Sequence, residues 1–154
     1  MGVEFIEPTN DLVEFIAVNM RQADVDEVWA SHRHLPYEAL MRGWDLSHSS
    51  VVVTVDGDPC VMIGLVIRDI LSGSGIPWLL GTEGAVKHKR HFLTQVPAVI
   101  DEMLSICPRL FNYVHAENRV SVNWLRRIGF TIDDPEPHGV AHELFHRFHL
   151  ERTR

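Results

Sequence analysis

Hydrophobic residues recur along the chain with two different periods, which predict a mixture of helices and strands. Residues 118–130 give the clearest example, because apolar side chains recur at helical spacing from Val120 to Ile128. Gly129 is placed to end that helix in the left-handed conformation, and an extended segment restarts at Phe130. This segment therefore predicts a helix that leads into a strand.

The first part of the chain predicts one short strand followed by helices. Residues 3–6 form the strand, and the helix after it is expected to break where Asp24 and Glu27 make a capping-box pattern. A third helical piece is expected to begin at Pro36 and to end at Gly43. Three helices should therefore precede the main strands.

A hairpin is the strongest local prediction. Two β-branched runs, residues 51–55 and 60–67, flank Asp56-Gly57, a dipeptide typical of tight hairpin turns. The remaining elements expected are a strand over 76–81, a helix over 92–106, a strand over 110–115 and a terminal strand over 141–150.

The order of these elements predicts an α+β fold. Helices should pack on both faces of a mainly antiparallel central sheet of about six or seven strands. A chain of 154 residues fits one domain, so residues 1–154 are interpreted as a single domain.

Composition narrows the classes of partner. The formal net charge of −7 is opposite to the basic surface that nucleic-acid binding needs, so no nucleic-acid partner is expected. The most apolar run, residues 60–67, is too short to span a bilayer, so no membrane association is expected. Cys60 and Cys107 lie in apolar segments, which predicts free thiols and an intracellular protein.

The segment at 118–130 also resembles the C-terminal motif of the GNAT acyltransferases. The resemblance is carried by Asn118, by the small Ser121 three positions later, and by the closing Gly129-Phe130. The order of the predicted elements is also the GNAT order, which implies transfer of an acetyl group from acetyl-CoA to an amine. The family commonly has a tyrosine as the acid for the thiolate four residues before the closing glycine. Leu125 occupies that position, so the catalytic motif is weakened.

A second resemblance is to small proteins of short-tailed phages that carry acetyltransferase-like or internal virion labels. The most distinctive stretch is FIAVNMRQADVDEVWAS, residues 15–31, and the likeness continues through 78–82, 92–93 and 118–130. It implies a phage protein in the host cell cytoplasm or in the virion, with virion or host proteins as partners. It leaves open whether the chain is an enzyme or a non-catalytic assembly protein.

The GNAT resemblance implies a cofactor site where strand 76–81 parts from the next strand. Backbone groups at the end of that strand would pair with the pantetheine arm. The following turn has one glycine, so basic side chains would hold the phosphates. The cofactor-binding residues implied are Leu80, Gly81 and Thr82 on the strand, Lys87, Lys89 and Arg90 on the turn, and Asn118, which can instead cap the following helix.

Two residues are candidates for the base that removes the proton of the acceptor amine. Glu83 follows the strand directly and is the first candidate, and His115 at the end of the neighbouring strand is the second. Each also has a structural interpretation, as an exposed loop glutamate and as a strand histidine. No replacement for the tyrosine acid is evident, although Ser121 or Asn123 could position water.

The segment His142–His146 satisfies the H-E-x-x-H pattern of zinc hydrolases. The same segment alternates between apolar and polar residues, which favours a terminal sheet strand over a helix. A zinc-dependent hydrolase is therefore the remote alternative, and no metal site is expected.

Overall fold

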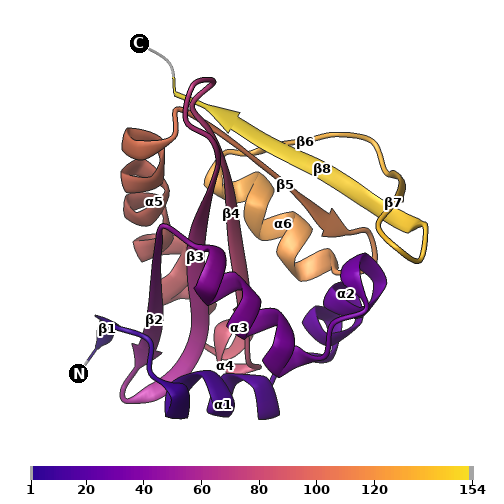
Figure 1. Cartoon of the computed structure of the whole chain (residues 1–154). Coiled ribbons are helices and arrows are strands. Elements are labelled where there is room, and N and C mark those ends of the chain that lie inside the picture. Colours follow the sequence, from indigo (N-terminus) through magenta and orange to yellow (C-terminus); the bar gives the residue numbers. More distant parts are fainter. Residues whose placement is uncertain (1, 153–154) are drawn as a thin grey trace.

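A sheet of eight strands forms the centre of the protein, and helices cover both of its faces (Figure 1). The computed structural model describes residues 2–152. The strand order is β1-β2-β3-β4-β5-β8-β6, with β7 paired to β8, and only β4 and β5 run parallel. The strands are β1 (Val3–Ile6), β2 (Ser49–Val55), β3 (Asp58–Asp69), β4 (Ser74–Gly81), β5 (Arg109–His115), β6 (Thr131–Ile132), β7 (Glu136–His138) and β8 (Glu143–Glu151). The predicted α+β class is therefore confirmed, with short β6 and β7 as additions.

The helices divide into two layers. They are α1 (Asn10–Val18), α2 (Gln22–His32), α3 (Pro36–Leu46), α4 (Gly84–Lys87), α5 (Lys89–Ile106) and α6 (Arg119–Ile128). One core joins the sheet to α4, α5 and α6 around Phe92 and Ile100. The other joins it to the first three helices around Ile16, Leu40 and Met62. Within residues 2–152, no helix is both long and apolar enough to cross a membrane.

The predicted hairpin is confirmed. Asp56 and Gly57 adopt positive φ angles of 51° and 81°, and β2 and β3 pair on either side of them. Positive φ at both positions gives the turn the twist that antiparallel strands require. The predicted α6 and its cap are also confirmed, because Gly129 has a φ of 118°.

The structure corrects the predicted end of α3. This helix continues past Gly43 to Leu46. A Cβ atom at Gly43 would lie 2.8 Å from the Trp78 ring, so this glycine allows the close approach of α3 to β4. The glycine therefore serves packing and does not end the helix.

The predicted capping box of α2 and the predicted side-chain cap at the N-terminus of α6 are corrected. Helix α2 begins at Gln22, so Asp24 and Glu27 lie inside it and their side chains bond to other elements. Asn118 precedes α6, but its side chain makes no capping hydrogen bond. All three polar side chains are directed to the interior instead.

The H-E-x-x-H segment is a strand, as the alternation predicted. His142 lies in the turn before β8 with a φ of 54°, and β8 pairs with β5 along its length. The His146 ring bonds to the carbonyl oxygen of Asp133 at 2.7 Å. The two histidines do not share a helical face, so the pattern does not form the zinc site of a hydrolase.

Candidate active site

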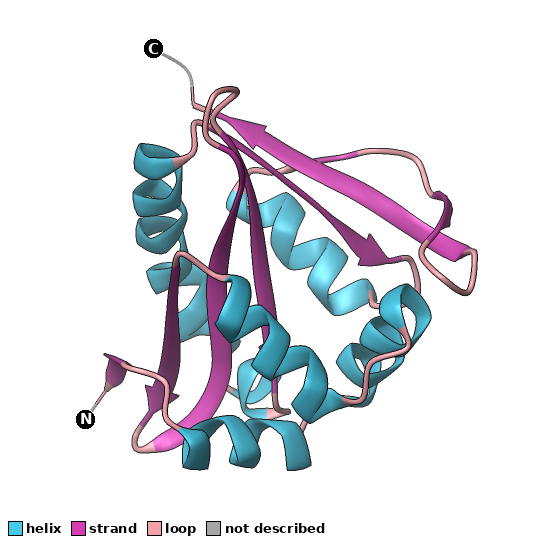
Figure 2. Cartoon of the chain, viewed as in Figure 1, coloured by secondary structure: helices cyan, strands magenta, loops and turns pink. Residues whose placement is uncertain are grey.

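The parallel strands β4 and β5 part after a short pairing. They pair only through Ser74 with Arg109 and Gly75 with Leu110, and then diverge (Figure 2). The divergence that the GNAT resemblance implied is therefore present. It leaves a gap between the two strands that is narrow near their start and wide near their carboxyl ends.

Asn112 bridges the narrow end of the gap. Its Nδ2 donates to the carbonyl oxygen of Pro77 on β4 at 2.8 Å, and its Oδ1 accepts from the Tyr113 N–H at 2.8 Å. One side chain therefore replaces the backbone hydrogen bonds at the point where the strands separate.

The β4 peptide groups that face the gap belong to alternate residues, namely Pro77, Leu79 and Gly81. Pro77 has no N–H, and its carbonyl bonds to Asn112. The Gly81 N–H donates to Asp24 Oδ2 at 2.9 Å, and its carbonyl accepts from the Arg21 N–H at 2.9 Å. Leu79 therefore carries the β4 peptide groups that face the gap without a partner among the described residues.

A buried polar network holds the wide end of the gap. Arg21 Nη1 donates to Asp24 Oδ1 at 2.8 Å, and both side chains are almost fully buried. Asn118 Nδ2 donates to Asp24 Oδ1 at 3.0 Å and to Glu27 Oε1 at 3.3 Å. Asn118 Oδ1 in turn accepts from Arg21 at 3.3 Å. The network therefore ties α2 to the start of α6.

Within this network, Glu27 is the carboxyl that also lines a cavity. Its Oε1 accepts from the His115 N–H on β5 at 2.8 Å, while Oε2 has no partner among the described residues. Burial and the nearby Asp24 charge raise the pKa of Glu27 to about 8, against the opposing hydrogen bonds from His115 and Asn118. Burial also raises the pKa of Asp24, which the Arg21 charge opposes. Glu27 is therefore mostly protonated at neutral pH, and its carboxylate is more basic than that of an ordinary glutamate.

Glu27 lines a cavity of about 430 Å³ that passes through the gap. On one side of the sheet the wall is apolar, with Val96, Val99, Ile100 and Met103 from α5 and Trp124, Leu125 and Ile128 from α6. On the other side polar groups lie beside the apolar Val28, Ala39 and Leu46. These polar groups are Ser31, His32 and His34 from α2 and the segment after it, Arg42 from α3, and His138 from β7. The cavity therefore has a polar opening beside α2, α3 and β7, where the lining residues His32 and Arg42 are exposed.

The polar opening carries several groups that are or can become cationic. The rings of His32 and His34 stack with centroids 5.3 Å apart, and those of Tyr113 and His138 with centroids 3.6 Å apart. Burial lowers the pKa of His32, and the neighbouring His34, His138 and Arg42 lower it further. Burial also lowers the pKa of His138. Glu27 is the one carboxylate among the described residues of the cavity wall.

The two predicted catalytic residues lie outside the cavity wall. Glu83 is exposed at the N-terminus of α4. His115 is buried, and its Nε2 lies 2.8 Å from Glu143 Oε1, which is a structural contact across β5 and β8. The His115 backbone contributes to the site by donating to Glu27.

The predicted cofactor residues do not lie together around the cavity. Leu80 lines the cavity, whereas the peptide groups of Gly81 are occupied by α2. The Thr82 N–H bonds to Cys60 on β3, so it faces away from the gap. Lys87, Lys89 and Arg90 are exposed where α4 meets α5, and Asn118 belongs to the buried network.

Glu27 is the cavity-lining carboxyl that the sequence analysis did not select. Arg21, Asp24 and Glu27 recur every three residues, which places three charged side chains on one face of α2. A charged face that lies beside the buried Val28 is the signal that could have identified the network. The sequence analysis instead assigned Asp24 and Glu27 to a capping box at the start of a helix.

Comparisons with known proteins agree with this architecture. No family model matches the sequence, and no curated protein matches it either. Among solved structures, spermidine N-acetyltransferase from Vibrio cholerae, in complex with CoA and spermine, is 13% identical with a TM-score of 0.72, over 97% of this chain and 95% of that chain. The microcin C7 self-immunity acetyltransferase MccE, in complex with acetyl-CoA and AMP, is 9% identical with a TM-score of 0.72, over 98% and 93%. Ard1 from Thermoplasma volcanium is 16% identical with a TM-score of 0.69, over 100% of both chains.

These likenesses extend over the whole chain at low identity, and they show the fold. The protein therefore has the fold of the GNAT acetyltransferases.

Proposed function

We propose that this protein is an acyl-CoA-dependent N-acyltransferase that transfers an acetyl group to an amine. The observation that carries the proposal is the Glu27 carboxyl in a cavity that passes between two diverging strands. The free peptide groups of Leu79 would pair with the pantetheine arm as an added strand would. Two of the similar structures contain CoA or acetyl-CoA, which supports this assignment.

Glu27 would act as the base. Acetyl-CoA supplies an activated thioester, and the amine attacks its carbonyl carbon while the C–S bond breaks. Glu27 Oε2 takes the proton that the amine loses, directly or through one water molecule. A carboxylate with a pKa of about 8 is more basic than that of an ordinary glutamate, but it is ionised in only about one molecule in ten at pH 7 and in about half at pH 8, so turnover should rise with pH over this range.

The departing thiolate needs a proton, and Leu125 cannot supply one. Ser121 lies one helical turn before Leu125, and both residues line the cavity. We infer that the Ser121 hydroxyl positions a bound water, and that solvent supplies the proton of the thiolate through this water while Ser121 keeps its own proton. This arrangement is weaker than a tyrosine and predicts slow turnover.

The phosphates of coenzyme A would lie on the exposed turn between α4 and α5. Lys87, Lys89 and Arg90 place three cations there, and the N-terminus of the 18-residue α5 adds a favourable dipole. We propose that side chains replace most of the backbone amides that a glycine-rich loop would provide.

The acceptor would enter through the polar opening and would carry an anionic group beside its amine. Arg42 attracts a carboxylate or phosphate and would repel a polyamine, and the neutral histidine rings there can donate hydrogen bonds to the anionic group. Glycine and glycinamide form a matched pair of probes, as do phosphoethanolamine and ethanolamine. We expect faster transfer to the anionic member of each pair, and Arg42→Gln should reduce the difference.

Two measurements test the proposed activity. Saturating acetyl-CoA should raise the midpoint of thermal unfolding, because a ligand that binds the folded state stabilises it. Release of free thiol should then depend on an added amine. Absence of both effects at millimolar acetyl-CoA would exclude an acyltransferase.

A non-catalytic virion or assembly protein of a phage is the second candidate. Leu125 and the single glycine of the α4 turn favour it, since both weaken the catalytic site. Under this proposal the chain is made in the host cytoplasm and has virion proteins as partners. Quantitative mass spectrometry of purified particles should then find it at a fixed ratio to the capsid protein, and its absence would count against this role.

A further inference from the structure

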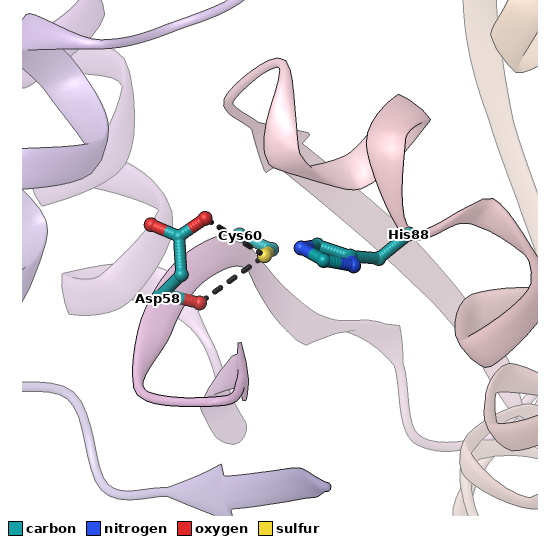
Figure 3. A group of neighbouring side chains, drawn as sticks. All are labelled: Asp58, Cys60 and His88. Atoms are coloured by element: carbon teal, nitrogen blue, oxygen red, sulfur yellow. Dashed lines mark hydrogen bonds between the residues drawn. The ribbon is translucent and has the colours of Figure 1, made fainter.

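A second group of polar side chains lies outside the active-site cavity, at the beginning of β3. Asp58 and Cys60 follow the hairpin turn, and His88 lies between α4 and α5. Their potential ligand atoms all lie within 4.8 Å of one another. Figure 3 shows the His88 ring directed at the Cys60 sulfur from one side, with the Asp58 carboxylate on the other side.

A β-bulge turns Cys60 towards His88. The pairing register shifts between Val53 and Thr54, so that Cys60 is the extra residue opposite them. In a regular strand neighbouring side chains point to opposite faces, yet Cys60 and Val61 both pack in the core that contains α4 and α5. The bulge is therefore the feature that brings the thiol to the histidine.

Gly84 keeps the space around this cluster open. A Cβ atom there would lie 2.9 Å from Cys60 Sγ, 3.0 Å from Thr82 Oγ1 and 3.2 Å from Asp58 Oδ2. Gly84 is not among the glycines with positive φ, so its backbone conformation does not require glycine. A side chain at this position would fill the space between the polar atoms.

We propose that Asp58, Cys60 and His88 form a binding site for a zinc-type divalent transition-metal ion. A thiolate, an imidazole and a carboxylate suit Zn²⁺ or Co²⁺, whereas Mg²⁺ and Ca²⁺ prefer ligand sets of oxygen only. Ligand bonds of about 2.0–2.3 Å place tetrahedral ligand atoms about 3.3–3.8 Å apart. The 4.0 Å between Cys60 Sγ and Asp58 Oδ2 is close to that range.

The exposure of the three residues suits an ion that enters from solvent. Asp58 is exposed, His88 is half-buried and Cys60 is buried, so the ion would approach past the carboxylate and take water as its fourth ligand. Burial and the Asp58 charge raise the pKa of the Cys60 thiol to about 11, so the free thiol is a poor nucleophile, and an ion that binds there must displace its proton. Lys87 is close enough for its charge to act on Cys60, and it would weaken cation binding.

Cobalt titration of the metal-free full chain tests the site, independently of any acyltransferase activity. Binding of one Co²⁺ per chain should produce a near-ultraviolet charge-transfer band diagnostic of a thiolate ligand, and Zn²⁺ should displace it. Zn²⁺ should also raise the midpoint of thermal unfolding, because the ion joins β3 to the α4–α5 turn. Absence of the band at millimolar Co²⁺ would overturn the proposal.

Variants separate this cluster from other metal-binding groups. Cys60→Ala should abolish the band, and His88→Gln should weaken Co²⁺ binding by more than about tenfold. Lys87→Gln should tighten it by up to about fivefold, the range of a surface charge effect. The matched controls are His91→Gln, an exposed histidine one turn along α5, and Cys107→Ala, the other buried cysteine.

Both controls should bind Co²⁺ as the unaltered chain does. A band that survives Cys60→Ala, or that disappears in Cys107→Ala, would contradict the assignment. Far-ultraviolet circular dichroism establishes whether each variant folds. If Cys60→Ala does not fold, the Co²⁺ affinity of the His88→Gln variant tests the site instead. Unchanged Co²⁺ binding by His88→Gln would also contradict the assignment.

Discussion

The narrow and wide ends of the β4–β5 gap are constructed in different ways. At the narrow end, one neutral side chain, Asn112, bridges the strands where their backbone pairing stops. At the wide end, side chains of α2 accept hydrogen bonds from backbone N–H groups that would pair with each other's strand in a continuous sheet. Asp24 accepts from Gly81 on β4, and Glu27 accepts from His115 on β5. The gap is therefore held open by specific buried partners, and the same partners place Glu27 in the cavity.

The largest effect is expected from Glu27→Gln, which separates the structural and chemical roles of the wide end. Glutamine keeps an oxygen that can accept from His115 and Asn118, but it cannot take a proton. Turnover should fall by about 10²–10⁴-fold while the fold is retained. Steady-state thiol release checks this, with Asp26→Asn as an exposed control on the same helix. Unchanged turnover in Glu27→Gln would remove Glu27 from the mechanism.

Arg21→Gln should produce the largest loss of stability. It leaves Asp24 buried without its cationic partner, and breaking a buried ion pair costs about 3–5 kcal/mol. Urea unfolding measures this change. Arg126→Gln, at an exposed position in α6, should stay within about 0.5 kcal/mol of the unaltered chain. Equal effects of the two substitutions would show that the network does not hold the wide end.

Leu125→Tyr should increase turnover, because it restores a hydroxyl where α6 faces the cavity. A positioned general acid contributes about 10²-fold or more, so a gain of at least tenfold is expected. Leu125→Phe adds the same ring without the hydroxyl and is the control. A gain of the same size in both variants would point to packing and not to proton transfer.

Asn112→Ala tests the narrow end. Loss of its side chain leaves the Pro77 carbonyl and the Tyr113 N–H without partners, at a cost of roughly 1–3 kcal/mol. Urea unfolding should therefore show a smaller loss than for Arg21→Gln. Asn123→Ala, on the exposed face of α6, should have little effect. A greater loss from Asn112→Ala than from Arg21→Gln would reverse the comparison of the two ends.

A pH dependence of stability is also expected, and it arises at Glu27. The pKa of this group is about 8 in the folded protein and near its ordinary value of 4.5 in the unfolded chain, so the folded protein holds the proton more tightly. Its contribution is complete below about pH 4.5 and is lost as the pH rises to about 8. Urea unfolding across this range should show a steeper decline for the unaltered chain than for Glu27→Gln. Parallel profiles would contradict the raised pKa.

Local signals were sufficient to predict much of the fold. The Asp56-Gly57 turn and the Gly129 cap depend on residues close in sequence, and both elements are present. The short β6 and β7 contain too few residues to show a period, which is why the pattern did not predict them. Gly43 was interpreted as a helix stop because its contact with Trp78 cannot be seen locally.

The candidate site was less predictable, because it depends on contacts between distant segments. Glu27 and His115 are 88 positions apart in the sequence, so nothing near Glu27 indicates that it is buried against β5. The gap itself was implied by the GNAT resemblance and not by any local pattern. Sequence reasoning selected Glu83 and His115, which lie near the carboxyl ends of β4 and β5 but do not line the cavity.

Hydrogen exchange at the amides of β4 tests the central claim most directly. Leu79 carries the peptide groups that face the gap without a described partner, whereas the Gly81 N–H is already bonded to Asp24. Saturating coenzyme A should slow exchange strongly at Leu79 and change it little at Gly81. Unchanged exchange at Leu79 with the cofactor bound would contradict the placement of the pantetheine arm between β4 and β5.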